Sequence, residues 1–295
     1  MLDGIINIYK EKGYTSHDVV ARLRGILGQK KIGHTGTLDP DAQGVLPVCL
    51  GKAAKLCDLL TDKEKTYRAV LLLGKVTDTQ DISGRVLKEY PVSTSPEELK
   101  SCVEKFQGDI MQIPPMYSAC KIQGKRLYEL AREGVVVERP PRPVHIQKIR
   151  VDDIRLPRAV LEVTCSKGTY IRTLCHDIGQ QLGCGGCMEE LLRTRSGMFG
   201  IAQALKLSQV EQLLEEGRLE EQILQIEDML AEYPRLDCTA VQDKLLDNGN
   251  PLPAGKDSGD FGSGWIRVYD SRGVFKGIYQ HKENTGKYFP VKMFL

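Results

Sequence analysis

The segment from residue 33 to residue 47 is GHTGTLDPDAQGVLP, and its first eight residues hold a carboxylate, an imidazole and two hydroxyls in a glycine-rich stretch. Pro40 restricts the backbone of Asp39 to an extended conformation, which projects the carboxylate instead of folding it into a helix. The wider stretch Lys30–Leu46 is rich in Gly, Thr, Asp and Pro. We therefore expect a loop that presents Asp39.

Two other interpretations of this segment must be weighed. A phosphate-binding loop would need the spacing GxxxxGK[ST], which the segment lacks. Alternatively, Asp39 caps the turn that follows it, as aspartate before proline often does. On these residues alone, a chemical role and a capping role for Asp39 both stay open.

Secondary structure can be predicted on either side of this loop. An apolar run at Gly4–Tyr9 predicts a strand, and so do the aromatic and branched residues of Lys65–Leu73. A helix is expected from Ser16, with Ser16 as its N-cap. Its apolar face carries Val19, Val20, Leu23 and Leu27.

Further along, Ser95-Pro96-Glu97-Glu98 is a capping box with proline in the first turn, and it opens a helix to about Phe106. Val144–Ile154 and Ala159–Cys165 predict a pair of strands, and Tyr170–Leu182 predicts a helix. Strands and helices alternate without regular βαβ spacing. We therefore expect an α+β fold with a mixed sheet, not a doubly wound one.

The end of the chain has a different character. An acidic, helix-like stretch at Ser208–Ala231 ends near Pro234, and glycine- and proline-rich sequence follows at Asn248–Gly264. Three strand-like runs come next, at Trp265–Tyr269, Val274–Tyr279 and Tyr288–Met293. We therefore divide the chain into residues 1–234 and a small β-rich unit, 235–295. A unit of that size is marginal alone and is expected to dock on the main domain.

Charge is unevenly distributed along the 295 residues, although the net charge is only +2. Met116–Arg172 carries 12 Lys and Arg against 6 Asp and Glu, whereas Ser208–Asp260 carries 4 against 13. This asymmetry favours one face that meets a polyanion, although chance asymmetry of solvated faces would look the same. No apolar run reaches 18 residues and no signal peptide is recognisable, so we expect a cytoplasmic protein without a membrane span.

Nine cysteines, most of them in apolar segments, are typical of reduced core residues in a reducing compartment. Cys184 and Cys187 have CxxC spacing, but a structural zinc site needs four ligands. The sequence has no second such pair, and His176 is the only plausible nearby helper. We therefore expect no metal here, and interpret the pair and its two glycines as a turn between helical segments.

Several motifs occur together in a fixed order. They are Lys12–Ser16, Gly33–Pro47, Lys65–Arg68, Gly74–Gly84, Ile113–Ala119 and Ser166–Arg172. In this order they resemble the TruB family of bacterial tRNA pseudouridine-55 synthases, over nearly the whole chain. Asn248-Gly249-Asn250-Pro251 is a looser match to the start of that family's PUA-like RNA-binding domain.

The resemblance implies a fold and an activity. The fold is a pseudouridine synthase catalytic domain with a mainly antiparallel sheet, a thumb insertion at residues 116–142 and a PUA-like domain at the end. The activity is isomerisation of the uridine at position 55 in the T loop of tRNA, by a monomer that uses no cofactor, metal or guide RNA. The family is also thought to help tRNA fold.

The resemblance also assigns the site. Asp39 is the nucleophile, a role that a carboxylate can fill, and Arg172 pairs with it. The target base must be flipped out of the RNA; Tyr67 then stacks on the uracil, and His34 inserts near the vacated place.

By the same resemblance, Tyr170 and Leu191 are expected to line the uracil pocket. Without the resemblance, Tyr67 and Leu191 would be core residues and His34 a structural histidine. Leu191 lies in a helix-like segment. Its neighbours Glu190 and Leu192 depart from the commoner family pattern, so the alignment of Leu191 with the family is the least secure among these residues.

The thumb insertion carries six cations: Lys121, Lys125, Arg126, Arg132, Arg139 and Arg142. Such residues fit phosphate contacts, which position RNA without recognising its sequence, although an ordinary solvated helix and loop would also carry them. Two rival functions remain. One is the guide-RNA-dependent relative, which is expected to lack the thumb; the other is a non-catalytic RNA-binding protein, which the intact Asp39, Tyr67 and Arg172 argue against.

Overall fold

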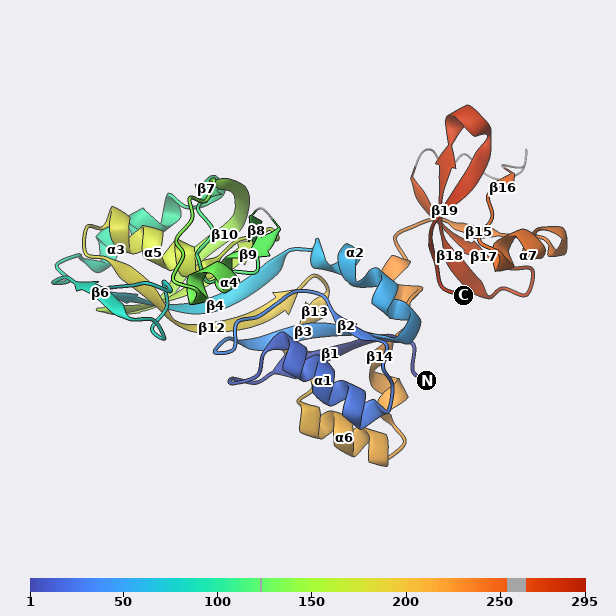
Figure 1. Ribbon diagram of the computed structural model, residues 1–295, viewed down its shortest axis with the longest axis horizontal. Helices are drawn as coiled ribbons and strands as arrows, with labels where there is room; N and C mark the ends of the chain where they lie inside the picture. Colours follow the sequence, from blue (N-terminus) through green and yellow to red (C-terminus); the bar gives the residue numbers. More distant parts are fainter. Residues whose placement is uncertain (123, 254–263) are drawn as a thin grey trace.

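The computed structural model describes residues 1–122, 124–253 and 264–295, and a mostly antiparallel sheet of ten strands dominates this part of the chain (Figure 1). The predicted α+β class is confirmed. The order of the strands is β14 (Ile223–Leu224), β1 (Gly4–Lys10), β3 (Gln43–Leu50), β12 (Gly186–Ser196), β4 (Lys65–Leu73), β11 (Arg158–Cys165), β10 (Arg142–Arg155) and β7 (Gly108–Gln112), with β2 (Ile32–His34) beside β3 and β13 (Phe199–Gly200) beside β12.

The sheet has two halves that meet between β3 and β12. These two strands are parallel and pair only at Leu192 with Gln43 and at Arg193 with Gly44. Each half has its own apolar core. One core packs under α1 (Ser16–Leu27) and α6 (Leu207–Glu215), and the other under α3 (Pro96–Glu104) and α5 (Ile171–Gln181). Because the pairing is so short, the sheet opens beside this junction.

The first helix begins as expected but has a different cap. Thr15, not Ser16, is the N-cap: its backbone is extended, and its side chain exchanges hydrogen bonds with Asp18 in a capping box. The predicted role of Ser16 was therefore wrong. Because Thr15 caps the helix, the buried Ser16 hydroxyl is free to accept the backbone N–H of Leu38 at 2.9 Å, and this bond ties α1 to the loop that carries Asp39.

The expected loop Lys30–Leu46 is shorter than predicted, because strands enter it from both sides. β2 pairs Ile32–His34 with residues 48–50, and β3 already begins at Gln43. Gly44 makes this possible. Its φ is +107°, and a Cβ there would lie 2.2 Å from the carbonyl oxygen of Arg193, so only glycine lets β3 approach β12 this closely.

The other predicted elements of the main domain are largely confirmed. β4 has the predicted bounds, β10 and β11 form the predicted pair, and α5 covers Ile171–Gln181. The capping box of Ser95 and Glu98 is present at the start of α3, which ends at Glu104. β5 (Lys75–Thr77) and β6 (Val86–Glu89) add a separate hairpin.

Two helix-like segments were assigned wrongly. Leu191 lies in strand β12, which pairs with β4 along residues 186–196. The turn at Cys184–Cys187 therefore connects helix α5 to a strand and does not join two helical segments. The acidic stretch Ser208–Ala231 is α-helical only as far as Glu215, and beyond it holds only two short 3-10 helices, at Leu219–Gln222 and Asp228–Leu230. Gly217, with φ +70°, follows the helix, and Ile223 and Leu224 form β14 against β1. In both cases the sheet supplied hydrogen-bond partners that local sequence does not reveal.

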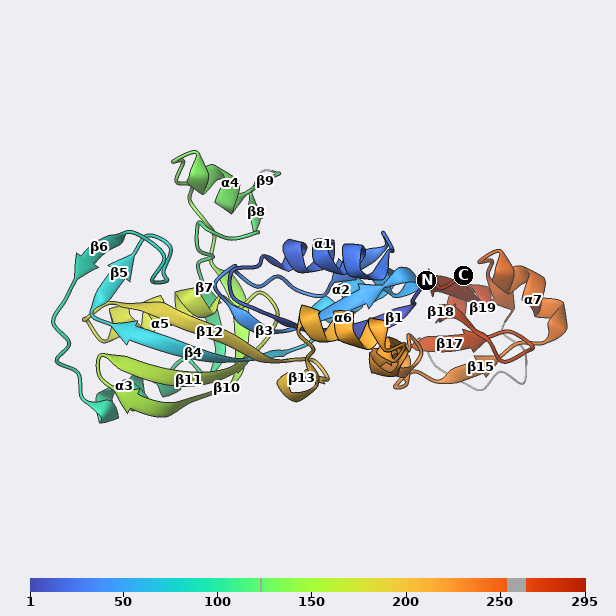
Figure 2. The same ribbon diagram turned by 90° about the horizontal axis from the view of Figure 1, so that it is seen from below.

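The thumb insertion forms a small unit that projects from the sheet (Figure 2). It contains the short strands β8 (Lys121–Ile122) and β9 (Lys125–Arg126) and the helix α4 (Leu127–Arg132). Its own buried cluster is small, comprising Met116, Cys120 and Leu127. Residue 123 lies outside the described residues.

The end of the chain forms a second sheet, seen at the right of Figure 1. Its order is β15 (Arg235–Asp237), β17 (Trp265–Tyr269), β18 (Phe275–Lys282), β19 (Lys287–Met293) and β16 (Leu252–Pro253), with α7 (Ala240–Asp247) beside it. Ile278 and Phe294 share a buried cluster with Ile5 and Leu56 of the main domain, so the unit is docked, as expected. Of the stretch Asn248–Gly264, residues 254–263 lie outside the described part. None of the described helices is long and apolar enough to span a bilayer.

Candidate active site

A cleft of about 410 Å³ lies where the two halves of the main sheet separate. The loop between β2 and β3 forms one wall, and β4 and β12 form the floor. The start of α5 and the base of the thumb complete it. Its lining includes Asp39, Tyr67, Tyr170, Arg172, Leu191 and Arg142, so six of the residues singled out from the sequence meet in one cavity.

Asp39 and Arg172 form an ion pair at the centre of this cleft. Nε of Arg172 lies 3.1 Å from Oδ2 of Asp39, and Nη2 donates to Oδ1 at 3.3 Å. The predicted pairing is therefore present, in the two-pronged geometry that suits a guanidinium and a carboxylate. The Arg172 side chain is 7 % exposed, whereas that of Asp39 is 41 % exposed toward the open cleft.

Opposing effects act on the Asp39 carboxyl. Its recessed position raises its pKa above the ordinary value, because desolvation disfavours the charged form. The Arg172 guanidinium opposes this rise in the pKa, and the nearby Asp81 carboxylate adds to it. Arg172 is thus the main group that favours the ionised form of Asp39.

Arg172 is held by more than Asp39. Nη1 donates to Oδ2 of Asp81 at 3.4 Å and to the carbonyl of Thr79 at 3.3 Å, and Nη2 donates to the carbonyl of Tyr117 at 2.7 Å. Asp81 was not singled out from the sequence, although it lies within the matched segment Gly74–Gly84. That motif was the only sequence signal for Asp81, and nothing in it shows which of its carboxylates faces the site.

The loop that carries Asp39 is fixed by buried cations. Nζ of Lys10 donates to the carbonyl of Pro40 at 3.1 Å. Arg193 donates to the carbonyls of Gly36 at 3.2 Å and Val45 at 2.7 Å, one near each end of the loop. Burial lowers the pKa of Lys10 to about 8. Sequence inspection missed both cations, because they look like ordinary strand residues.

Three predicted pocket residues lie around the ion pair. Tyr67 projects from β4, Leu191 from the neighbouring strand β12, and Tyr170 precedes α5. Burial raises the pKa of both tyrosines, so each phenol is neutral at physiological pH. Together they give the cleft an aromatic and apolar lining beside the carboxylate.

His34 lies at the end of β2 and is not among the residues that line the cleft. Its ring meets that of His17 edge-on, with centroids 5.3 Å apart. Its Nδ1 accepts the N–H of Gly36 at 3.4 Å. Burial, with smaller effects of His17 and Arg193, lowers the pKa of His34 to about 4, so the ring is neutral at physiological pH.

The thumb cations are mostly free to meet a partner. Lys121, Lys125, Arg126 and Arg132 are exposed, whereas Arg139 is half-buried. The guanidinium groups of Arg126 and Arg132 lie 5.8 and 5.5 Å from the ring of Tyr128. Arg139 differs, because it donates to the carbonyl of Pro114 and so helps to fix the base of the thumb. Arg142 alone of the six lines the cleft.

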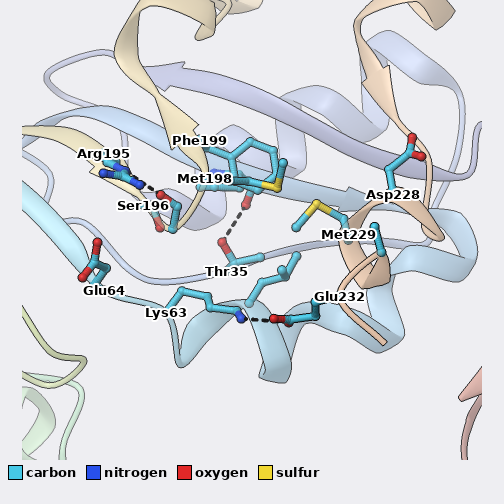
Figure 3. A pocket seen from close by; sticks show the side chains of 14 residues that line it. Thr35, Lys63, Glu64, Arg195, Ser196, Met198, Phe199, Asp228, Met229 and Glu232 are labelled. Carbon is cyan, nitrogen blue, oxygen red and sulfur yellow. Dashed lines mark hydrogen bonds and ion pairs between the residues drawn. The ribbon is translucent and has the colours of Figure 1, made fainter. Parts of the chain in front are cut away.

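A second cavity, of about 370 Å³, has Thr35 in its lining (Figure 3). The ion pair of Lys63 with Glu232 borders it. Met198, Phe199 and Met229 give it an apolar wall. None of the residues singled out for chemistry lines this cavity, so the cleft around Asp39 is the better candidate for the active site.

All nine cysteines are free. Cys184 and Cys187 are buried, and burial raises the pKa of both thiols. Within the described ranges, no three His, Cys, Asp or Glu side chains gather where they could hold a metal ion.

Comparison with known proteins decides the family. The model described as TruB family pseudouridylate synthase (N terminal domain) matches residues 24–171, and the tRNA pseudouridylate synthase B C-terminal domain matches residues 172–231. The chain belongs to the TruB family. The boundary between these two models crosses the active site, because it places Arg172 and β12 in the second one, although β12 lies in the middle of the main sheet.

Relatives of this TruB-family chain span its full length. A tRNA pseudouridine synthase B of Lachnoclostridium phytofermentans is 50 % identical and covers 100 % of both chains. A tRNA pseudouridine synthase B of Clostridium perfringens is 44 % identical, and the match covers 97 % of each chain. Among solved structures, a chain in a Cbf5–Nop10–Gar1 complex is 26 % identical, with a TM-score of 0.73 over 99 % of this chain and 85 % of that one. The mixed catalytic sheet followed by a small β-rich unit is thus a shared architecture.

Proposed function

We propose that this TruB-family enzyme converts the uridine at position 55 in the T loop of tRNA to pseudouridine, with Asp39 as the nucleophile. The observation that carries the proposal is the Asp39–Arg172 ion pair in a cleft lined by Tyr67, Tyr170 and Leu191. The names of the relatives supply the reaction and the class of substrate. The position in the T loop and the nucleophile are inferences of our own.

The chemistry asks for an ionised carboxylate beside a bound base. Arg172 favours the ionised form of Asp39, because its charge opposes the rise in the Asp39 pKa that burial causes. The guanidinium also fixes the direction of both carboxylate oxygens, since two of its nitrogens contact them. Isomerisation exchanges a C–N bond for a C–C bond within one nucleotide. It therefore needs no redox partner, energy donor or metal.

The base must leave the RNA stack to reach Asp39. Tyr67 then stacks on the uracil, Tyr170 and Leu191 enclose it, and His34 fills the place that the base vacates. His34 lies outside the cleft in the free protein, as a residue that enters the RNA would. Its low pKa keeps it neutral, so it can insert between bases without the cost of burying a charge.

The RNA backbone is held by surfaces around the cleft. We assign phosphate contacts to Lys121, Lys125, Arg126, Arg132 and Arg142, and to Arg139 a contact that depends on the thumb moving. Residues 1–234 act as the catalytic domain, and residues 235–295 as a PUA-like RNA-binding domain. The enzyme works as a cytoplasmic monomer without cofactor or guide RNA, and holding the T arm can also help tRNA fold.

The thumb and the catalytic residues favour this proposal over its rivals. The projecting thumb disfavours a guide-RNA-dependent enzyme, since that relative is expected to lack one. The complete ion pair disfavours a protein that only binds RNA. Purified protein mixed with unmodified tRNA carrying tritium at C5 of its uridines separates the three. Our proposal predicts tritium release without any guide RNA, and no release would refute it.

A further inference from the structure

Two buried cations lie on the floor of the cleft. Lys65 is 5 % exposed and Arg193 is 1 % exposed, and both line the cavity beside Tyr67. The fold places them together: Lys65 and Tyr67 are two residues apart on β4 and so face the same side. Arg193 is the cross-strand partner of Tyr67 on β12.

Neither cation has a counter-ion among the described residues. In the described part of the chain, no carboxylate lies within 4.0 Å of either side chain. Lys65 donates to the carbonyls of Thr61 and Lys63, and Arg193 to those of Gly36 and Val45. Arg193 also donates to the Tyr67 hydroxyl. These bonds use two of three N–H groups of Lys65 and three of five of Arg193, so donors remain for a ligand.

Burying a cation without a counter-ion is unfavourable, and two such cations side by side raise the cost. Burial, and next the charge of Arg193, lower the pKa of Lys65 to about 8. A bound anion in the cleft would relieve both effects. The floor is therefore built for negative charge that the free protein does not supply.

The depth of these cations indicates which anion they meet. Lys167 and Arg142 line the same cavity but are exposed, so they suit hydrated phosphates at its mouth. Lys65 and Arg193 instead flank Tyr67, where the base would stack. We propose that Lys65 and Arg193 stabilise the negative charge that develops on the uracil ring when its bond to ribose breaks. This inference rests on the proposed function.

The charge follows from the bonds that change. When the C1′–N1 bond breaks, its electron pair stays on N1 and spreads to O2 and O4 of the ring, while a carboxylate oxygen of Asp39 bonds to C1′. After the ring turns, C5 attacks C1′ and the bond to Asp39 breaks, returning its electron pair to the carboxylate. The proton on C5 passes through water to N1. Fixed donors aimed at charge that develops in a transition state act like an oxyanion hole.

The test varies the charge of Lys65 and the stability of the leaving base. Lys65→Gln removes the charge but keeps an N–H donor for the carbonyls of Thr61 and Lys63. Its rate of target-nucleotide loss is measured at saturating RNA, with uridine or 5-fluorouridine at the target. Fluorine stabilises the base anion, so that base depends less on the protein. We expect a loss of about a hundredfold with uridine and a loss below about tenfold with 5-fluorouridine.

Two further variants complete the design. Lys65→Arg keeps the cation and should restore most of the rate with uridine. Lys167→Met, at the mouth of the cleft, should weaken RNA binding without changing the ratio of the two rates. Equal losses of Lys65→Gln with both bases, in a variant that melts like wild type, would overturn the inference. Failure of the wild type to convert uridine would instead refute the proposed function.

Discussion

Replacing Arg172 by lysine changes the geometry around Asp39 while keeping the charge. The guanidinium contacts both oxygens of Asp39, and it also reaches Asp81 and the carbonyl of Tyr117. One ammonium nitrogen cannot span these partners, so Arg172→Lys leaves Asp39 less well oriented and less well paired. We therefore expect a severe loss of rate from a nominally conservative change.

The size of the loss can be worked from the structure. Breaking a fully buried ion pair from one side costs on the order of 3–5 kcal/mol. The Asp39 side chain is 41 % exposed and lysine retains the charge, so a smaller cost applies. We expect at least about 2.7 kcal/mol, which is roughly a hundredfold in single-turnover rate. Binding of tRNA should stay nearly normal, because exposed cations elsewhere contact its phosphates.

Single-turnover rates at saturating tRNA and the tRNA dissociation constant are measured on the same preparation. Arg158→Lys is a matched control, since Arg158 forms a two-pronged pair with Glu189 on the surface, away from the cleft. That variant should react and bind like wild type. A normal rate with weakened, salt-sensitive binding in Arg172→Lys would refute the reasoning, because Arg172 would then act only on phosphate.

Four further outcomes are expected. Asp39→Asn should abolish tritium release and leave tRNA affinity within several-fold, and turnover near the wild-type rate would contradict the nucleophile. The rate should fall as pH drops through the raised pKa of Asp39, and Arg172→Gln should move that fall to higher pH because it removes the charge that opposes the rise; an unchanged profile would contradict the pairing. Ending the chain after Pro234 should weaken tRNA binding more than it slows single-turnover chemistry, provided that melting shows a folded protein; normal binding without reaction would speak against an RNA-binding domain there. Elemental analysis should find no stoichiometric zinc, whereas one zinc per chain that is lost in a Cys184→Ser and Cys187→Ser double mutant would overturn the turn interpretation.

Local sequence was enough wherever an element carries its own signals. The strand β4 and the capped helix α3 have the expected bounds to within two residues. The fold class followed from the irregular alternation of strands and helices. These features depend on neighbours within one turn or one strand, which the sequence displays directly.

Errors arose where distant partners decide the structure. Leu191 looks helical in isolation, but β4 supplies hydrogen bonds along the whole of β12. Ile223 and Leu224 pair with β1 from more than two hundred residues away. Ser16 was expected to cap its helix, yet it holds the Asp39 loop. Pairing across such separations leaves no local pattern.

The candidate site was only partly visible in the sequence. The motifs located Asp39 and Arg172, and the fold brought them together. Sequence inspection missed Asp81, Lys10 and Arg193. Asp81 contacts the guanidinium of Arg172, and the two cations contact backbone carbonyls. Contacts of these kinds follow no regular spacing in the sequence. Only the folded chain reveals which charges face the cleft.

The most direct test of the central claim is a map of pseudouridine in tRNA from cells that carry the gene, cells that lack it, and cells that lack it but express Asp39→Asn. The account predicts pseudouridine at position 55 only in the first. Loss confined to another position, an unchanged map without the gene, or restoration by Asp39→Asn would contradict it.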